Sequence, residues 1–211
     1  MRIVFQGDSI TDVGRNTERG SLISIGQGYP LMVTGDLGAK YPGKFEFINR
    51  GVSGNRIVDV YARIKADVWN LEPDVLSILI GVNDVWHEAG NRNGVDAVRF
   101  EKMYRILVED TKERFPEIKI LVLEPFVLPG TATQEKWDVF YGEVLLRAAA
   151  AKRVAADYGL IFVPLQGMFD EACKTAPADY WLGDGVHPTP FGHRLIAGAW
   201  EKAAAENGII G

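Results

Sequence analysis

The residues of this sequence that could do chemistry are a serine near its start and an aspartate and a histidine near its end. Ser9 follows Gly7 and Asp8, directly after the apolar run at residues 3–5. A serine hydroxyl is a weak nucleophile, so it needs a base and donors that stabilise the oxyanion formed by its attack. His187 could be the base, and Asp184 could hold its imidazole in the right tautomer and stabilise the cation. A serine, a histidine and an aspartate that can act together in this way predict acyl transfer.

Three groups could stabilise an oxyanion: the backbone N–H groups of Ser9 and Gly54 and the side-chain amide of Asn83. A glycine at position 54 lets the backbone come close to a ligand. Taken alone, each motif is typical of a turn, including Gly-Val-Asn-Asp at residues 81–84 and the segment 184–188 before a helix. Their joint occurrence, in this order and at the ends of predicted strands, favours a catalytic site.

Strand-length apolar runs alternate with helical patterns, which indicates βαβ units and a parallel sheet. We predict strands at residues 2–5, 45–49, 75–80, 119–123 and 160–163. We predict helices at residues 29–39, 57–68, 100–108 and 137–148, and a last helix starting at Thr189-Pro190. Residues 10–28 and 125–133 are predicted as loops, and residues 167–188 as irregular with one helical turn near Phe169.

These elements predict a three-layer α/β/α sandwich with a doubly wound, five-stranded parallel sheet. We find no internal repeat or linker, so residues 1–211 are predicted as a single domain. In such a sheet the carboxyl ends of the strands share one edge. Ser9, Gly54, Asn83 and the segment 184–188 should therefore meet there, although they are far apart in sequence.

The composition excludes several classes of function. The formal net charge is −5 with no basic cluster, which argues against nucleic-acid binding. No apolar run is long enough to cross a membrane and too few apolar residues precede Gly7 for a signal peptide, so we expect a cytoplasmic protein. Cys173 is the only cysteine, there are three histidines and no HExxH, and residues 51–55 lack the full dinucleotide-binding pattern. We therefore predict no disulfide, no metal and no cofactor.

Aromatic residues flank the candidate catalytic residues in the sequence. Trp86, Tyr180 and Trp181 could bind the flat face of a sugar, although burial in the core is an equal alternative. His87 is interpreted as a polar loop residue, with substrate contact as the alternative. His193, one turn inside the last predicted helix, is interpreted as a helix-surface or packing residue.

The motifs resemble the four blocks of the SGNH (GDSL-type) hydrolases, in the family's order. Gly7-Asp8-Ser9 matches the serine block, residues 51–55 the glycine block, residues 81–84 the asparagine block, and residues 184–187 the final Asp-x-x-His block. Ile10 stands where the name-giving motif has leucine, a change that many members share. The resemblance implies a flavodoxin-like fold, and it assigns Ser9, His187 and Asp184 as the triad.

The longer stretches 7–15, 49–55 and 80–86 are similar to the intracellular acetylxylan esterase branch. That resemblance implies deacetylation of xylo-oligosaccharides in the cytoplasm and a ring-like homo-oligomer. We therefore predict a serine esterase that removes short acyl groups from a small-molecule or oligosaccharide ester. The alternatives are a lysophospholipase or general short-chain esterase or lipase, and a carbohydrate-binding protein without turnover.

Overall fold

In residues 1–18 and 23–211, which the computed structural model describes, five strands form one sheet in the order β2-β1-β3-β4-β5. Every neighbouring pair of strands is parallel. The strands are β1 (Arg2–Gly7), β2 (Glu46–Asn49), β3 (Val75–Leu79), β4 (Lys119–Leu123) and β5 (Ile161–Val163). The predicted sheet is confirmed, with the first strand two residues longer than expected.

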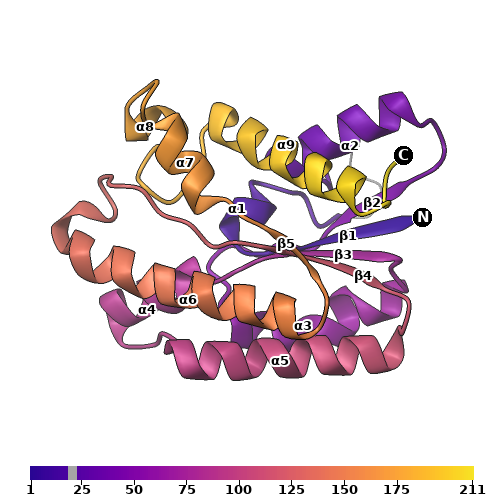
Figure 1. The fold of residues 1–211 in the computed structure, drawn as a ribbon, viewed down its shortest axis with the longest axis horizontal. Helices are drawn as coiled ribbons and strands as arrows, with labels where there is room; N and C mark the ends of the chain where they lie inside the picture. The colour runs from indigo at the N-terminus through magenta and orange to yellow at the C-terminus, as the bar shows by residue number, and fades with distance from the viewer. Residues whose placement is uncertain (19–22) are drawn as a thin grey trace.

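Long helices cover both faces of this sheet, as Figure 1 shows. On one face lie α2 (Tyr29–Lys40) and α9 (Pro190–Glu206), and on the other lie α3 (Ile57–Asp67), α5 (Ala97–Arg114) and α6 (Trp137–Asp157). Short 3-10 turns occupy Trp69–Leu71 and Gln134–Lys136. The three-layer α/β/α sandwich is therefore confirmed.

The strands are apolar throughout because both faces of the sheet are buried. Successive side chains of a strand point to opposite faces, so Leu76 and Ile78 belong to one core cluster and Val75 and Leu79 to the other. On the second face the ring centroid of Trp200, from α9, lies 5.7 Å from that of Phe5. Its indole N–H donates to Ser77 Oγ at 3.0 Å, which ties α9 to the middle of the sheet.

The order of the strands places the topological switch point of the sheet between β1 and β3. The chain passes from β1 to β2 on one side and then crosses to β3 on the other, so helices leave these two strands in opposite directions. Open α/β sheets bind ligands at such a switch point. Ser9 follows β1 at once, and Asn83 stands in α4 (Val82–Asn91), directly after β3.

Helices replace three stretches that were predicted as turns or loops. The first is α1 (Ser9–Asp12), at the start of the predicted loop 10–28, of which residues 19–22 lie outside the described residues. The others are α4, where a turn was favoured, and α8 (Ala178–Trp181), in the segment predicted as irregular. The helical turn predicted near Phe169 is confirmed by α7 (Gln166–Ala172). A helix of four to seven residues is too short to establish a 3.6-residue period, and α4 buries Asn83 and Asp84 instead of a purely apolar stripe.

Candidate active site

Ser9, His187 and Asp184 form one chain of hydrogen bonds. Ser9 Oγ lies 2.9 Å from His187 Nε2, and Nδ1 of the same ring lies 2.7 Å from Asp184 Oδ2. All three residues are partly exposed, so a ligand can reach them. The structure therefore brings together the three residues that the sequence singled out, in the order that general-base activation of a serine requires.

Ser9 is positioned by the residues on either side of it. Asp8 Oδ1 accepts the N–H of Ile10 at 3.0 Å and caps α1. A Cβ at Gly7 would clash with the Leu79 carbonyl oxygen and with Thr11, so only glycine fits the end of β1. Ser9 is thus the first residue of a helix, where the helix itself does not use the backbone N–H.

His187 is positioned by the tight turn that Asp184 begins. Asp184 Oδ1 accepts the backbone N–H groups of Val186 at 2.9 Å and of His187 at 2.8 Å. Gly185, with φ +96°, supplies a backbone conformation that other residues rarely adopt. The turn is anchored to the 125–133 segment, because the N–H of Leu128 donates to the Gly185 carbonyl and that of Ala132 to the Asp184 carbonyl, both at 2.9 Å.

Asp184 stays ionised in this arrangement. Burial raises the pKa of Asp184, but the hydrogen bonds from the His187 backbone, the His187 ring and the Val186 N–H outweigh it and leave the pKa below its usual value. One oxygen of the carboxylate holds the turn while the other faces the imidazole. The carboxylate can therefore orient the ring and stabilise it when it carries a proton.

Two of the three candidate oxyanion donors, Gly54 and Asn83, also lie together. Gly54 has φ +81°, and the side-chain N–H of Asn83 donates to the carbonyl of the next residue, Asn55, at 3.2 Å. The Asn83 amide is buried and held beside this turn, at the carboxyl ends of β1 and β3. The structure therefore brings Asn83, at the start of α4 after β3, close to the Gly54 turn that follows β2.

His87 is not the loop residue that the sequence suggested. It lies on α4, four residues after Asn83, and therefore on the same face of the helix. Its Nε2 is the nearest described atom to a Cβ built on Gly54, at 3.9 Å, and its buried Nδ1 has no hydrogen-bond partner in the described part of the chain. The imidazole thus faces the candidate oxyanion turn, and the signal that could have found it is the spacing from Asn83.

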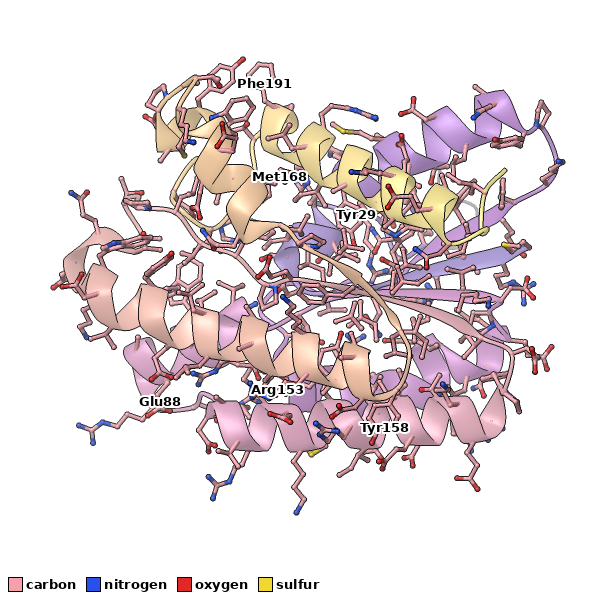
Figure 2. The ribbon with its side chains drawn as sticks, in the orientation of Figure 1. Tyr29, Glu88, Arg153, Tyr158, Met168 and Phe191 are labelled. Carbon is pink, nitrogen blue, oxygen red and sulfur yellow. The ribbon has the colours of Figure 1, made fainter. Side chains whose placement is uncertain are left out.

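The three aromatic residues predicted to flank the site take different places. The Trp86 ring lies 5.7 Å from the His187 ring, between centroids, and 6.2 Å from that of Phe140. Tyr180 stacks on Phe191 at 4.5 Å, where α9 begins beside α8 (Figure 2). The indole N–H of Trp181 donates to the carbonyl of Ala172 at 3.1 Å, so this residue ties α8 to α7. Trp86 is the one with a described contact to the catalytic candidates.

Two buried carboxyls beside the site were missed in the sequence. Burial raises the pKa of Asp8 to about 7 and that of Asp84 to about 8, although the N–H groups of Ile10 and Ile57 donate to them.

His193 is the packing residue that was expected. Burial lowers its pKa to about 4, so its neutral Nδ1 accepts the N–H of Tyr29 at 3.2 Å.

The described part of the chain holds neither a cluster of metal-ligating side chains nor a membrane-spanning helix. Over residues 1–18 and 23–211, no group of three or more His, Cys, Asp and Glu side chains could hold a metal ion. In the same part of the chain, no helix has the length and apolar character needed to cross a membrane. Cys173 is a half-buried free thiol.

Known proteins resemble this chain along most of its length. The model of the GDSL-like lipase/acylhydrolase family matches residues 5–195. An acetylxylan esterase from Geobacillus stearothermophilus is 35% identical over 209 residues, with 94% of this chain and 91% of that protein covered. The crystal structure of Axe2, an acetylxylan esterase from that organism, has a TM-score of 0.86 at 33% identity and covers 96% and 93% of the two chains. A structure described as a GDSL-like lipase from Parabacteroides merdae ATCC 43184 has a TM-score of 0.92 at 38% identity and covers 97% and 95%.

The buried carboxyl of Asp8 makes a testable prediction for stability. Below its ordinary pKa of 3.8 the carboxyl is neutral in both states, and as the pH rises toward about 7 it ionises readily only in the unfolded chain. The contribution of this carboxyl to the free energy of unfolding therefore falls over this range, and Asp8→Asn should remove that contribution. We expect the stability advantage of Asp8→Asn to grow by about 2–3 kcal/mol between pH 5 and pH 8 in urea denaturation. Asp179→Asn, at an exposed position, is the control, and an advantage independent of pH would contradict the prediction.

Proposed function

This chain belongs to the GDSL-like lipase/acylhydrolase family and is a carboxylic ester hydrolase, and we propose that it uses Ser9 to remove acetyl groups from carbohydrates such as xylo-oligosaccharides. The observation that carries the mechanism is the hydrogen-bonded chain from Ser9 through His187 to Asp184. The carbohydrate substrate is supported by the acetylxylan esterase that shares 35% of its sequence with this chain.

In the proposed mechanism Ser9 Oγ attacks the carbonyl carbon of the ester while His187 Nε2, 2.9 Å away, takes its proton. The tetrahedral intermediate collapses when His187 gives that proton to the oxygen of the leaving alcohol. This leaves an acetyl group on Ser9 Oγ. Water then attacks the acyl-enzyme, with His187 again as the base, and acetate leaves as Ser9 recovers its proton.

Asp184 is proposed to keep His187 in the tautomer that this cycle needs. Nε2 can accept the serine proton only if the ring carries its proton on Nδ1, and Asp184 Oδ2 accepts that Nδ1–H at 2.7 Å. The ionised carboxylate also stabilises the imidazolium that forms during each transfer. Two structures of Axe2 are described as catalytic mutants, one lacking a serine and the other an aspartate, which supports assigning both residue types here.

The oxyanion is proposed to bind between the N–H groups of Ser9 and Gly54 and the Asn83 amide. Asn83 already has one N–H committed to the Asn55 carbonyl at 3.2 Å, which fixes the plane of the amide. A planar amide has two N–H donors, so the second is available to a ligand. Donors fixed in this way stabilise the charge that develops in the transition state without having to reorganise.

We also propose a cytoplasmic location and a homo-oligomeric assembly. Both rest on the resemblance of residues 7–15, 49–55 and 80–86 to the intracellular acetylxylan esterase branch. Light scattering of the purified protein would measure the assembly.

The first prediction of this mechanism concerns the nucleophile and its orienting carboxylate. Ser9→Ala should abolish acetate release. In Asp184→Asn the amide oxygen must stay with the backbone N–H groups of Val186 and His187, so its NH₂ would face Nδ1 and favour the wrong tautomer. The corresponding change in serine proteases lowers kcat by roughly 10⁴-fold, and we expect a comparably severe loss.

The control for Asp184→Asn is Asp179→Asn, five residues earlier on the exposed side of α8, which should keep normal activity. Acetate release from acetylated xylo-oligosaccharides measures both variants. If Asp179→Asn were the inactive one, the assignment of Asp184 would be wrong. Full activity in Ser9→Ala would refute the whole proposed mechanism.

The second prediction concerns the oxyanion site. Asn83→Ala should lower kcat by about 10²–10³-fold, the usual loss for one such donor. KM should change little, because the contact strengthens only in the transition state. A folded Asn83→Ala variant with normal kcat would show that Asn83 does not stabilise the oxyanion and has only the structural role of its hydrogen bond to the Asn55 carbonyl.

The third prediction concerns the acyl group. In the proposed reaction the carbonyl oxygen lies at the oxyanion donors and the leaving oxygen points toward His187, and we propose that the acyl group points away from His187, on the side of the His87 imidazole. We expect this imidazole to leave room for a short acyl group only. The kcat/KM of p-nitrophenyl esters should therefore fall steeply from acetate to octanoate, whereas a preference for octanoate would favour the lipase alternative.

A further inference from the structure

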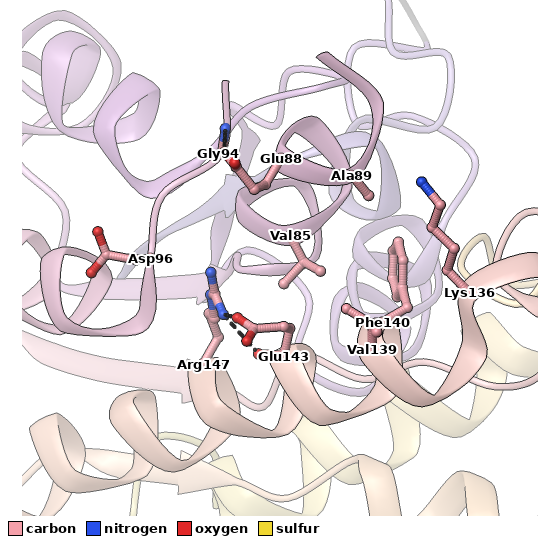
Figure 3. A pocket seen from close by; sticks show the side chains of 10 residues that line it. All are labelled: Val85, Glu88, Ala89, Gly94, Asp96, Lys136, Val139, Phe140, Glu143 and Arg147. Atoms are coloured by element: carbon pink, nitrogen blue, oxygen red, sulfur yellow. Dashed lines mark hydrogen bonds and ion pairs between the residues drawn. The ribbon is translucent and has the colours of Figure 1, made fainter. Parts of the chain in front are cut away.

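A pocket of about 430 Å³ lies between α4 and α6, outside the catalytic residues (Figure 3). The α4 side of its wall is formed by Val85, Glu88 and Ala89, and the α6 side by Phe140 and Glu143, among others. A second pocket of about 140 Å³ shares Ala89, Lys136 and Phe140 with the first and is also lined by Trp86. The two pockets are therefore neighbours on the surface between α4 and α6, and we call the pair the α4–α6 groove.

One side chain, Trp86, joins the α4–α6 groove to the catalytic candidates. Trp86, in its smaller pocket, has its ring centroid 5.7 Å from that of His187. Ala132 and Thr133 line the same pocket, and the N–H of Ala132 donates to the Asp184 carbonyl at 2.9 Å. The groove is thus built on the segment that anchors the catalytic turn.

The position of His187 decides which part of an ester the groove can receive. His187 must give its proton to the leaving oxygen, so the alcohol part of the ester lies on the side of His187 and Trp86. The acyl part points away from His187 in the proposed reaction, on the side of His87, whose Nε2 lies 3.9 Å from a Cβ built on Gly54. The α4–α6 groove therefore continues the alcohol side of the site, which in an acetylated carbohydrate is the sugar.

The lining of the groove suits a neutral ligand with many hydroxyl groups. Figure 3 shows charged side chains of both signs around an apolar floor that includes Val85 and Phe140. The buried guanidinium of Arg147 is bound to Glu143 and to the Val95 carbonyl, so its charge is already paired. Hydroxyl groups can donate to carboxylates and accept from Lys136, and the C–H faces of a sugar can cover apolar surface. The volume of the larger pocket falls in the range of small-molecule sites, about 300–1,000 Å³.

We propose that the α4–α6 groove binds the sugar residues that adjoin the acetylated one, so that the enzyme acts faster on acetylated oligosaccharides than on acetylated monosaccharides. This inference rests on the proposed carbohydrate esterase function and adds to it a site for the chain of the substrate. The groove contributes binding at a distance from the reacting bond, and Trp86 joins it to His187.

Ala89→Trp tests the proposal because Ala89 is exposed and lines both pockets, so an indole there should fill the groove without disturbing the core. The matched control is Ala66→Trp, at an exposed position on α3. The measurement is kcat/KM for acetylated xylotriose, acetylated xylose and p-nitrophenyl acetate. Ala89→Trp should lower the ratio of trisaccharide to monosaccharide about tenfold, mainly through KM, and should leave p-nitrophenyl acetate hydrolysis unchanged. Ala66→Trp should change none of the three.

An unchanged ratio in folded Ala89→Trp would overturn the proposal, as would an equal loss on all three substrates. A loss confined to long-chain p-nitrophenyl esters would assign the groove to the acyl chain and would overturn it too. If Ala89→Trp fails to fold, Lys136→Trp makes the same test, because the exposed Lys136 also lines both pockets. The unsubstituted enzyme tests the function separately, since failure to release acetate from any sugar would refute the carbohydrate esterase itself.

Discussion

The hydrogen bond between Ser9 Oγ and His187 Nε2 joins residues 178 positions apart in the sequence, and it depends on the rest of the fold. The sheet brings these residues together because it holds Ser9 at the end of β1. The helix α9, which follows His187, packs on the same sheet. Trp200 of α9 lies against Phe5 of β1 and donates to Ser77 of β3. The core contacts of α9 therefore set the position of His187 relative to Ser9.

The site also contains groups that lower stability. Asp8 and Asp84 are both almost fully buried, and burial raises the pKa of both well above the usual range for aspartate. Asp8 uses one oxygen to cap α1 and so places Ser9, while its buried Oδ2 has no partner among the described residues. Natural sequences break the rules of polar burial mainly at functional sites, and here the exceptions lie next to the residues proposed to react.

The sequence predicted the strands and long helices, whose apolar residues form continuous runs or recur at helical spacing. It missed the features that depend on tertiary contacts. The strands were found within one or two residues, because uninterrupted apolar runs and punctuation by Gly and Pro identify buried parallel strands. Ser9, Asn83 and His187 could be singled out as candidates because each follows a strand or precedes a helix, at the sheet edge where the topology brings these segments together. The helix α4 was missed because the residues of its first turn include the polar Asn83 and Asp84. The position of His87 was also missed, because it depends on where the Gly54 turn lies in the folded chain. Asp8 was read only as part of a motif, since its burial is invisible until α1 is known.

The missed helix α4 is also the element that carries three residues of the proposed substrate site. Residues three and four apart on a helix lie on one face, so Asn83 places Trp86 and His87 beside it once α4 begins at Val82. Asn83 is bound to the Asn55 carbonyl, His87 faces Gly54, and Trp86 contacts the ring of His187. A single helical face therefore borders the oxyanion donors, the acyl side and the alcohol side of the proposed reaction. A change in the start or the rotation of α4 would alter all three together, whereas a change in one of these side chains can alter one part of the substrate site alone.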